Sequence, residues 1–227
     1  MAINYVSTAI TDITNLLNNE PDSKKQLLIA KWLSKYSKYL NQEKTFSPRY
    51  LKRYLRGEII MVDFGYRIGN EEGGPHYAIV LDKNNSISSG IITVMPLSSK
   101  KASKNTNKYT IDLGTEIYDA LTAKANKAFA DTLQVKQLTH SSTSNHASAT
   151  VQLSFSNNRF QKIRDEINLM KTGSIALVSQ ITTISKMRII KPKRTTDPLS
   201  GIRLSDATLD LIDDKIIKLY TGYSDHK

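Results

Sequence analysis

The chain has 227 residues, no cysteine and a formal net charge of +11, because 32 lysines and arginines outnumber 21 aspartates and glutamates. The absence of cysteine excludes disulfide bonds, thiolate nucleophiles and cysteine-ligated zinc. No run of about eighteen apolar residues occurs and the first residues lack the pattern of a signal peptide, so we expect a soluble cytoplasmic protein without a membrane segment. The positive charge favours a polyanionic partner, with nucleic acid first and an acidic protein or anionic membrane surface as alternatives.

Two helices are predicted before residue 56. Apolar residues recur at spacings of three and four from Ile3 to Leu17, which places them on one face of a helix that ends near residues 18–21. A second helix over 23–41 carries an apolar and aromatic stripe that includes Trp32, together with five lysines. Two interpretations stay open: a basic arm that grips a nucleic acid backbone, or a helical hairpin packed on the main domain with a solvated lysine face.

From Arg56 onward the pattern changes to that of short β-strands. Strands are predicted at 58–64, 77–81, 91–95, 108–113, 150–155 and 174–181, with polar links rich in glycine, asparagine and serine. Helices are predicted at 115–133, at 158–171 and after the N-cap residue Ser205, and residues 191–203 read as a loop rich in proline and lysine. This order indicates an α+β fold built on a small, strongly bent antiparallel sheet or barrel.

The four histidines are scattered along the chain. His140 and His146 lie in a run rich in serine, threonine and asparagine, which we interpret as a solvated loop. A metal site is disfavoured there, because the run has no obvious third ligand at helical or strand spacing.

The stretch from Arg56 to Ser99 carries the residues best suited to chemistry on a phosphate ester. The loop at 65–75 holds four glycines and two adjacent glutamates, but neither the Walker spacing nor the dinucleotide fingerprint. His76 begins the next predicted strand, and an unperturbed imidazole exchanges protons near pH ~6.5. The strand after that ends in hydroxyls and cations that suit a phosphate: Ser98, Ser99, Lys100 and Lys101. The alternative interpretations are a structural histidine and a simple polar turn.

Four short motifs follow one another along the chain. They are R-G-E-I-I-M-V-D-F from Arg56, G-N-E-E-G-G-P-H-Y-A-I-V-L from Gly69, V-M-P-L-S-S from Val94 and A-L-V-S-Q-I-T-T-I-S-K-M-R-I from Ala176. Together they resemble the MazF/PemK family of toxin endoribonucleases from bacterial type II toxin–antitoxin systems. The resemblance covers about half of the chain, over residues 56–99 and 174 to about 220.

The resemblance implies a compact SH3-like β-barrel with helices, a homodimer and an antitoxin protein as partner. It also implies cleavage of single-stranded RNA without a metal or other cofactor, by attack of the ribose 2′-hydroxyl on the adjacent phosphate. Under this resemblance the family's catalytic arginine falls on His76, and its catalytic threonine or serine falls on Ser98. The substrate-binding candidates are Arg67, Asn70, Glu71, Ser99, Lys100, Lys101, Gln180 and Thr182.

We therefore expect two parts: a basic N-terminal helical extension over 1–55 and a MazF/PemK-like barrel domain over 56–227, enlarged by an insertion at about 100–173. The two added segments could shape the choice of RNA, hold an antitoxin, neutralise the toxin in cis, or only pack on the barrel. Because His76 stands in place of an arginine, two other functions stay open. One is a nucleic-acid- or protein-binding module that does not cut, and the other is a toxin that inhibits a cellular enzyme such as DNA gyrase.

Overall fold

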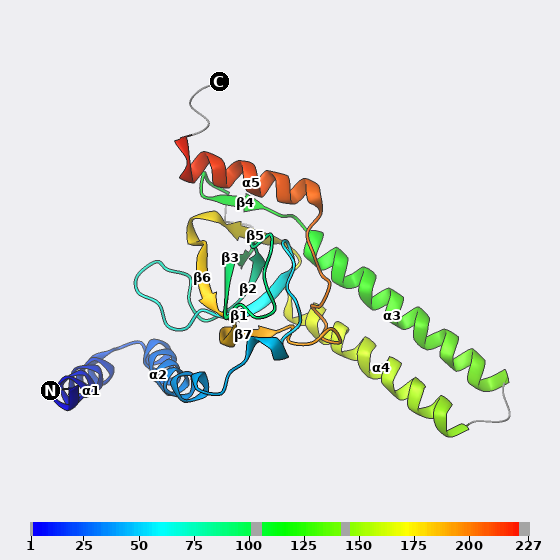
Figure 1. Cartoon of the computed structure of the whole chain (residues 1–227), viewed down its shortest axis with the longest axis horizontal. Coiled ribbons are helices and arrows are strands. Elements are labelled where there is room, and N and C mark those ends of the chain that lie inside the picture. Colours follow the sequence, from blue (N-terminus) through cyan, green and yellow to red (C-terminus); the bar gives the residue numbers. More distant parts are fainter. Residues whose placement is uncertain (1, 101–105, 142–145, 223–227) are drawn as a thin grey trace.

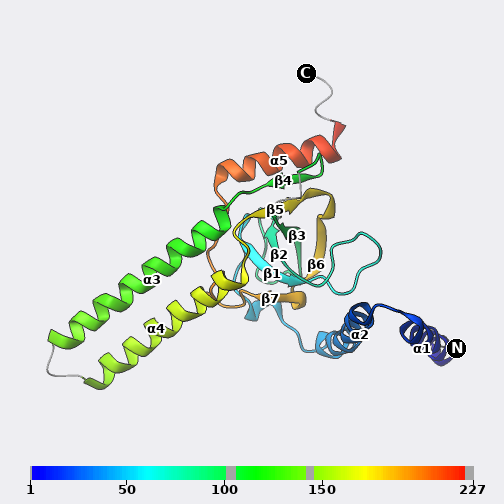
Figure 2. The same ribbon diagram turned by 180° about the vertical axis from the view of Figure 1, so that it is seen from behind.

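The computed structural model describes residues 2–100, 106–141 and 146–222, without the side chains of residues 134–156. A small bent sheet forms the centre of the molecule (Figure 1). Two long paired helices project from one side of it, and the two N-terminal helices lie on another side. Seen from behind, the C-terminal helix crosses the end of the sheet that is far from the N-terminal helices (Figure 2).

The sequence predicted most of these elements to within a few residues, but the two long helices at 116–141 and 146–169 were predicted shorter, at 115–133 and 158–171. The strands at 182–185 and 189–191 were not predicted. The helices are α1 (Ala2–Asn19), α2 (Ser23–Glu43), α3 (Glu116–Ser141), α4 (His146–Leu169) and α5 (Asp206–Tyr220), with short 3-10 turns η1 (Pro48–Tyr50), η2 (Val178–Gln180) and η3 (Lys186–Arg188). The strands are β1 (Ile59–Asp63), β2 (Pro75–Val80), β3 (Ile91–Ser99), β4 (Thr110–Asp112), β5 (Ser174–Leu177), β6 (Thr182–Ser185) and β7 (Ile189–Lys191). The predicted N-cap of α5 is confirmed, since the Ser205 side chain accepts a hydrogen bond from the Thr208 amide.

The strands form one antiparallel sheet in the order β4-β5-β3-β2-β1-β7. The long strand β3 pairs with both β5 and β6, which η2 separates along the chain. Among the described residues β4 and β7 do not pair, so the sheet is bent but not closed. The α+β prediction is confirmed, and the open, bent sheet is consistent with the predicted barrel.

Both faces of the sheet are buried. Because side chains alternate along a strand, neighbouring residues point to opposite faces. Ile59 and Ile79 belong to a cluster that joins the strands to α3, α4 and α5, whereas Ile60 and Ala78 belong to a second cluster among the strands and the segment 46–54. Burial on both faces explains why these strands read as nearly continuous apolar runs.

The predicted strand at 150–155 is wrong, because these residues belong to α4. Alternation over six residues is a short signal, and pairing of α3 with α4 into a long hairpin overrides it (Figure 1). About half-way along this hairpin the ring centroids of Phe129 and Phe160 lie 5.3 Å apart. The predicted loop around His140 and His146 is also helical on both sides, and the side chains of these histidines lie outside the described residues.

The helix α2 is attached to the sheet around Asp63, the last residue of β1. Lys35 forms an ion pair with the Asp63 carboxylate, and Arg188 donates from Nε to the Asp63 carbonyl oxygen at 2.8 Å. The Arg188 guanidinium also lies 5.3 Å from the ring centroid of Trp32. One face of α2 therefore docks on the sheet, as the packed-hairpin interpretation requires.

The remaining apolar surface of the N-terminal helices stays exposed. No residue of α1 is buried, and Ile3 is 79% exposed. On α2, Leu28 and Tyr36 are 48% and 50% exposed. The periodicity thus predicted the helices correctly, but only part of the α2 stripe packs on the sheet. Within the described ranges, no helix is both long and apolar enough to cross a lipid bilayer.

Gly65 is a point of close approach between the sheet and α2. Its φ is +73°, and a Cβ added there would lie 2.5 Å from the Trp32 ring. We expect Gly65→Ala to push Trp32 away from the sheet, because a ring cannot yield that far in place. Trp32 is the single tryptophan of the chain, so its fluorescence emission should move to longer wavelength.

Gly69→Ala is the matched control for this substitution. Gly69 also has a positive φ, +62°, but an added Cβ there meets no atom within 4 Å. It imposes the same kind of backbone strain without touching Trp32, so its emission maximum should equal that of the unmodified protein. Equal maxima for all three proteins would show that Trp32 does not pack on Gly65 in solution.

Candidate active site

The ends of β2 and β3 bring the two predicted catalytic residues together. Ala78 of β2 lies opposite Pro96 of β3. The same register, continued by two residues, places His76 across from Ser98. Residues directly opposite in antiparallel strands carry their side chains on the same face, and both of these are half-buried. An imidazole and a hydroxyl therefore share one end of the sheet.

A pocket of about 200 Å³ lies beside this strand end. Pro96 is in its wall, and Ser98 lies two residues further along the same face of β3, but neither Ser98 nor His76 lines the pocket. The link to the pair is Glu72, which lines the pocket and contacts the His76 ring. Four predicted substrate-binding residues line the pocket: Arg67, Glu71, Gln180 and Thr182. The other lining residues are Phe64, Glu72, Pro96, Ser179 and Ile181.

The side chain of Gln180 holds the 65–74 loop in place over η2. Its Oε1 accepts a hydrogen bond from the Glu72 amide, and its Nε2 donates to the Asn70 carbonyl oxygen, both at 3.2 Å. Within the loop, Arg67 donates to the Glu71 carboxylate at 3.2 Å and to the Phe64 carbonyl oxygen at 3.1 Å. The pocket wall is therefore shaped by the loop before any ligand binds, and Asn70 contributes through its backbone.

Three of the predicted substrate-binding residues that the structure describes, Asn70, Ser99 and Lys100, do not line the pocket. The Lys100 ammonium lies 2.5 Å from Oδ2 of Asp112 on β4, and Ser99 pairs with Ser174 of β5. The ion pair holds the Lys100 side chain at the β4–β5 side of the strand end, and the strand register places Ser99 beside β5. Lys101 lies outside the described residues, so its predicted role stays a prediction.

Both ring nitrogens of His76 face hydrogen-bond acceptors. Nε2 lies 2.9 Å from the Glu72 carboxylate, and Nδ1 lies 3.2 Å from the Leu97 carbonyl oxygen. Only the doubly protonated imidazolium donates from both nitrogens. The hydrogen bond to Glu72 raises the pKa of His76 above its ordinary value, although partial burial opposes this. The geometry therefore favours a positive charge on His76.

Glu72 is the residue of this site that the sequence prediction missed. The alignment of motifs pointed to its neighbour Glu71, and adjacent glutamates in a loop cannot be told apart by pattern. The available signal for the contact with His76 was spacing, because Glu72 lies four residues before His76, with the strand start between them.

No group of three or more histidine, aspartate or glutamate side chains that could hold a metal ion occurs among the described residues.

Comparison with known families decides which group of proteins this site belongs to. A family model described as PemK-like, MazF-like toxin of type II toxin–antitoxin system matches residues 55–170. That range is just over half of the chain. The chain belongs to this toxin family. The matched range runs through the helical hairpin and ends before the last of the four motifs. A comparison with curated proteins gives no match.

The resemblance to the PemK/MazF family allows the charge of His76 to be compared with that of the residue expected at this position. The resemblance places an arginine at this position, and arginine is a permanent cation. An imidazolium held by Glu72 supplies the same sign of charge, and unlike arginine it can release a proton near neutral pH. We propose that a protonated His76 would keep the sign of charge that the resemblance expects at this position and would add a titratable proton.

We expect Glu72→Gln to lower the pKa of His76, because the amide carries no charge to stabilise the imidazolium. The folded pKa is raised, so the charged ring persists to higher pH than in a free histidine and is lost as pH rises through that pKa. Proton NMR titration of the His76 ring should therefore show a midpoint at lower pH in Glu72→Gln. Glu71→Gln is the control, because Glu71 pairs with Arg67 and should leave the midpoint unchanged. Equal midpoints in all three proteins would contradict the pairing.

Proposed function

We propose that this toxin is a metal-independent endoribonuclease that cleaves single-stranded RNA. The observation that carries the proposal is the ring of His76, held by Glu72 across the strand pair from Ser98 and next to a pocket that Glu72 and Arg67 line. This combination offers a proton donor, a hydroxyl and a cation at one place. A phosphodiester is the substrate that uses all three, since its cleavage develops negative charge on phosphorus oxygens and on the leaving oxygen.

In the proposed reaction the ribose 2′-oxygen attacks the adjacent phosphorus and the bond to the 5′-oxygen breaks. His76 gives its proton to the leaving 5′-oxygen, and Ser98 donates a hydrogen bond to a phosphoryl oxygen. Arg67 binds the phosphate of the RNA backbone in the pocket. Two carboxylates in the pocket wall, Glu71 and Glu72, can accept the proton of the 2′-hydroxyl. The products are a 2′,3′-cyclic phosphate and a free 5′-hydroxyl.

The test is incubation of the purified protein with a long single-stranded RNA in the presence of EDTA. We expect fragments with 5′-hydroxyl ends, and no cleavage of the same sequence with 2′-deoxyriboses, because the attacking oxygen is then absent. Cleavage of the deoxy substrate, or dependence on added Mg²⁺, would overturn the mechanism. Binding of RNA without any cleavage would instead favour the non-cutting binding module.

The family also suggests the partners and setting of the toxin. We propose that an antitoxin protein inhibits it, that it forms a homodimer, and that it acts in the cytoplasm. We further propose that residues 56–227 form the catalytic barrel domain and residues 1–55 an added basic extension. Sedimentation equilibrium of the purified chain tests the dimer, and growth arrest on expression tests the toxicity.

A further inference from the structure

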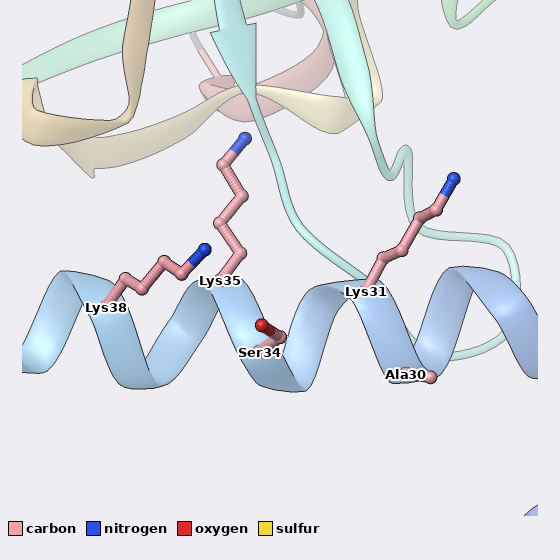
Figure 3. A pocket seen from close by; sticks show the side chains of 5 residues that line it. All are labelled: Ala30, Lys31, Ser34, Lys35 and Lys38. Atoms are coloured by element: carbon pink, nitrogen blue, oxygen red, sulfur yellow. The ribbon is translucent and has the colours of Figure 1, made fainter.

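The helix α2 presents a row of lysines on the side that faces the sheet. Lys31, Lys35 and Lys38 are spaced four and three residues apart, which places them on one helical face. With Ala30 and Ser34 they line a shallow groove of about 580 Å³. Figure 3 shows the ammonium ends of all three lysines on this side of the helix.

Two of these lysines have no counter-charge among the described residues. Lys35 pairs with Asp63, whereas Lys31 and Lys38 have neither an ion pair nor a hydrogen bond within the part of the chain that the structure describes. α2 contains five lysines and a single acid, Glu43, at its last position. Like charges at these spacings weaken a helix, so a bare row of lysines gains stability when an anion lies across it.

The groove lies close to the candidate active site. Trp32 of α2 packs on Gly65, which begins the loop over the pocket, and Phe64 beside it lines that pocket. Two arginines lie near this contact: Arg188 on the Trp32 ring and Arg67 in the pocket wall. The groove and the pocket are therefore linked by the contact between α2 and the start of the 65–74 loop.

We propose that the lysine row of α2 binds the phosphate backbone of single-stranded RNA outside the cleavage pocket. The identity of the polyanion as RNA rests on the proposed function. Backbone binding requires a charged groove, because phosphates are bound through their charge and with little regard to base sequence. It does not require close shape complementarity.

The composition of the groove disfavours a protein in this place. Protein interfaces depend on large apolar or aromatic anchors in closely fitting pockets, but only Ala30 and Ser34 lie between the lysines here. A second copy of the chain would bring two basic faces together, which repel each other. The observed groove has charge without anchors, which fits a nucleic acid backbone.

The test compares two double variants that lose the same charge. Lys31→Gln/Lys38→Gln removes the two unpaired lysines of the row. Lys127→Gln/Lys218→Gln removes two exposed lysines from α3 and α5, which lie elsewhere on the molecule (Figure 1). The probe is a fluorescent single-stranded RNA of about 16 nucleotides with 2′-O-methyl riboses, long enough for such a groove and unable to undergo 2′-hydroxyl attack.

Fluorescence anisotropy over a range of salt concentrations gives the affinity and its salt dependence. Each phosphate contact to a single strand contributes about 0.7 to the slope of log K against log salt, so the α2 variant should lose about 1.4 from that slope. Its affinity near 0.1 M salt should fall on the order of tenfold, whereas the control variant should match the unmodified protein. Trp32 emission without RNA checks that α2 stays docked in both variants.

Equal slopes and affinities of the two variants for the RNA would overturn the proposal. A loss of affinity for an acidic protein in the α2 variant would not rescue it. Equal binding of the RNA by the two variants differs from failure of the proposed function. If the α2 variant loses affinity for the methylated RNA but the unmodified protein does not cut unmodified RNA, the proposed role of the lysine row stands and the nuclease proposal is refuted. If the protein cleaves unmodified RNA but the α2 variant binds the methylated RNA as tightly as the unmodified protein does, the nuclease stands and the lysine row is refuted.

Discussion

His76→Ala is expected to lower the rate of RNA cleavage by about 100- to 10,000-fold, the range over which general acid–base groups act. Alanine removes both the proton donor and the positive charge that Glu72 holds beside the pocket. His76→Arg restores the charge without a proton that is released near neutral pH. We therefore expect its rate to lie between those of the alanine variant and the unmodified protein.

Initial rates with a single-stranded RNA, measured in EDTA, test this expectation. Binding of the 2′-O-methylated RNA should persist in His76→Ala, because the backbone contacts proposed for Arg67 and the lysine row of α2 remain. Retained binding separates loss of chemistry from loss of folding. A cleavage rate of His76→Ala close to that of the unmodified protein would remove His76 from the mechanism.

Glu166→Ala is expected to lower the free energy of unfolding by about 3 kcal/mol, because it removes a buried carboxylate that a buried tyrosine hydroxyl and a partly exposed lysine both depend on. Glu166 is 3% exposed and accepts a hydrogen bond from the Tyr77 hydroxyl at 2.6 Å. Its second oxygen pairs with Lys191 of β7. Burial, together with this hydrogen bond, raises the pKa of Tyr77 far above its ordinary value. Without Glu166, the Tyr77 hydroxyl and the Lys191 ammonium lose their partner.

Thermal unfolding should show the loss as a fall of about 10 °C in Tm for a chain of this size. Asp165→Ala is the control, because Asp165 is the neighbouring acid on α4 and its bond to Gln161 is exposed. The control should stay within about 0.5 kcal/mol of the unmodified protein. Equal destabilisation by the two substitutions would show that the network does not anchor the α3–α4 hairpin to β2.

The position of the candidate site could be predicted from sequence because its parts are short and local. His76 begins a strand and Ser98 nearly ends one, and the antiparallel register of two neighbouring strands then brings them together. The charge state of His76 could not be predicted in this way. It depends on Glu72 and on the Leu97 carbonyl oxygen, which reach the ring only when the loop and β3 fold beside it.

For the lysines too, sequence predicted the position along the chain but not the ionic partner. Sequence placed Lys100 beside the hydroxyls at the end of β3, but its ammonium pairs with Asp112, which arrives on β4. Sequence also predicted α2 with its lysines and left two interpretations open. The structure shows why neither describes the helix completely, since the face with Trp32 docks on the sheet while Lys31 and Lys38 remain without a counter-charge in the described residues.

Sequence alone determined the family resemblance, most helices and strands, and the strand ends that carry His76 and Ser98. These features arise from short-range patterns: helical and strand periodicity, an N-cap, and motifs of a few residues. Tertiary structure alone decided that residues 150–155 are helical, that Glu72 pairs with His76, and that the α2 lysines face the sheet. Each of these depends on contacts between elements, and local pattern carries no information about which elements meet.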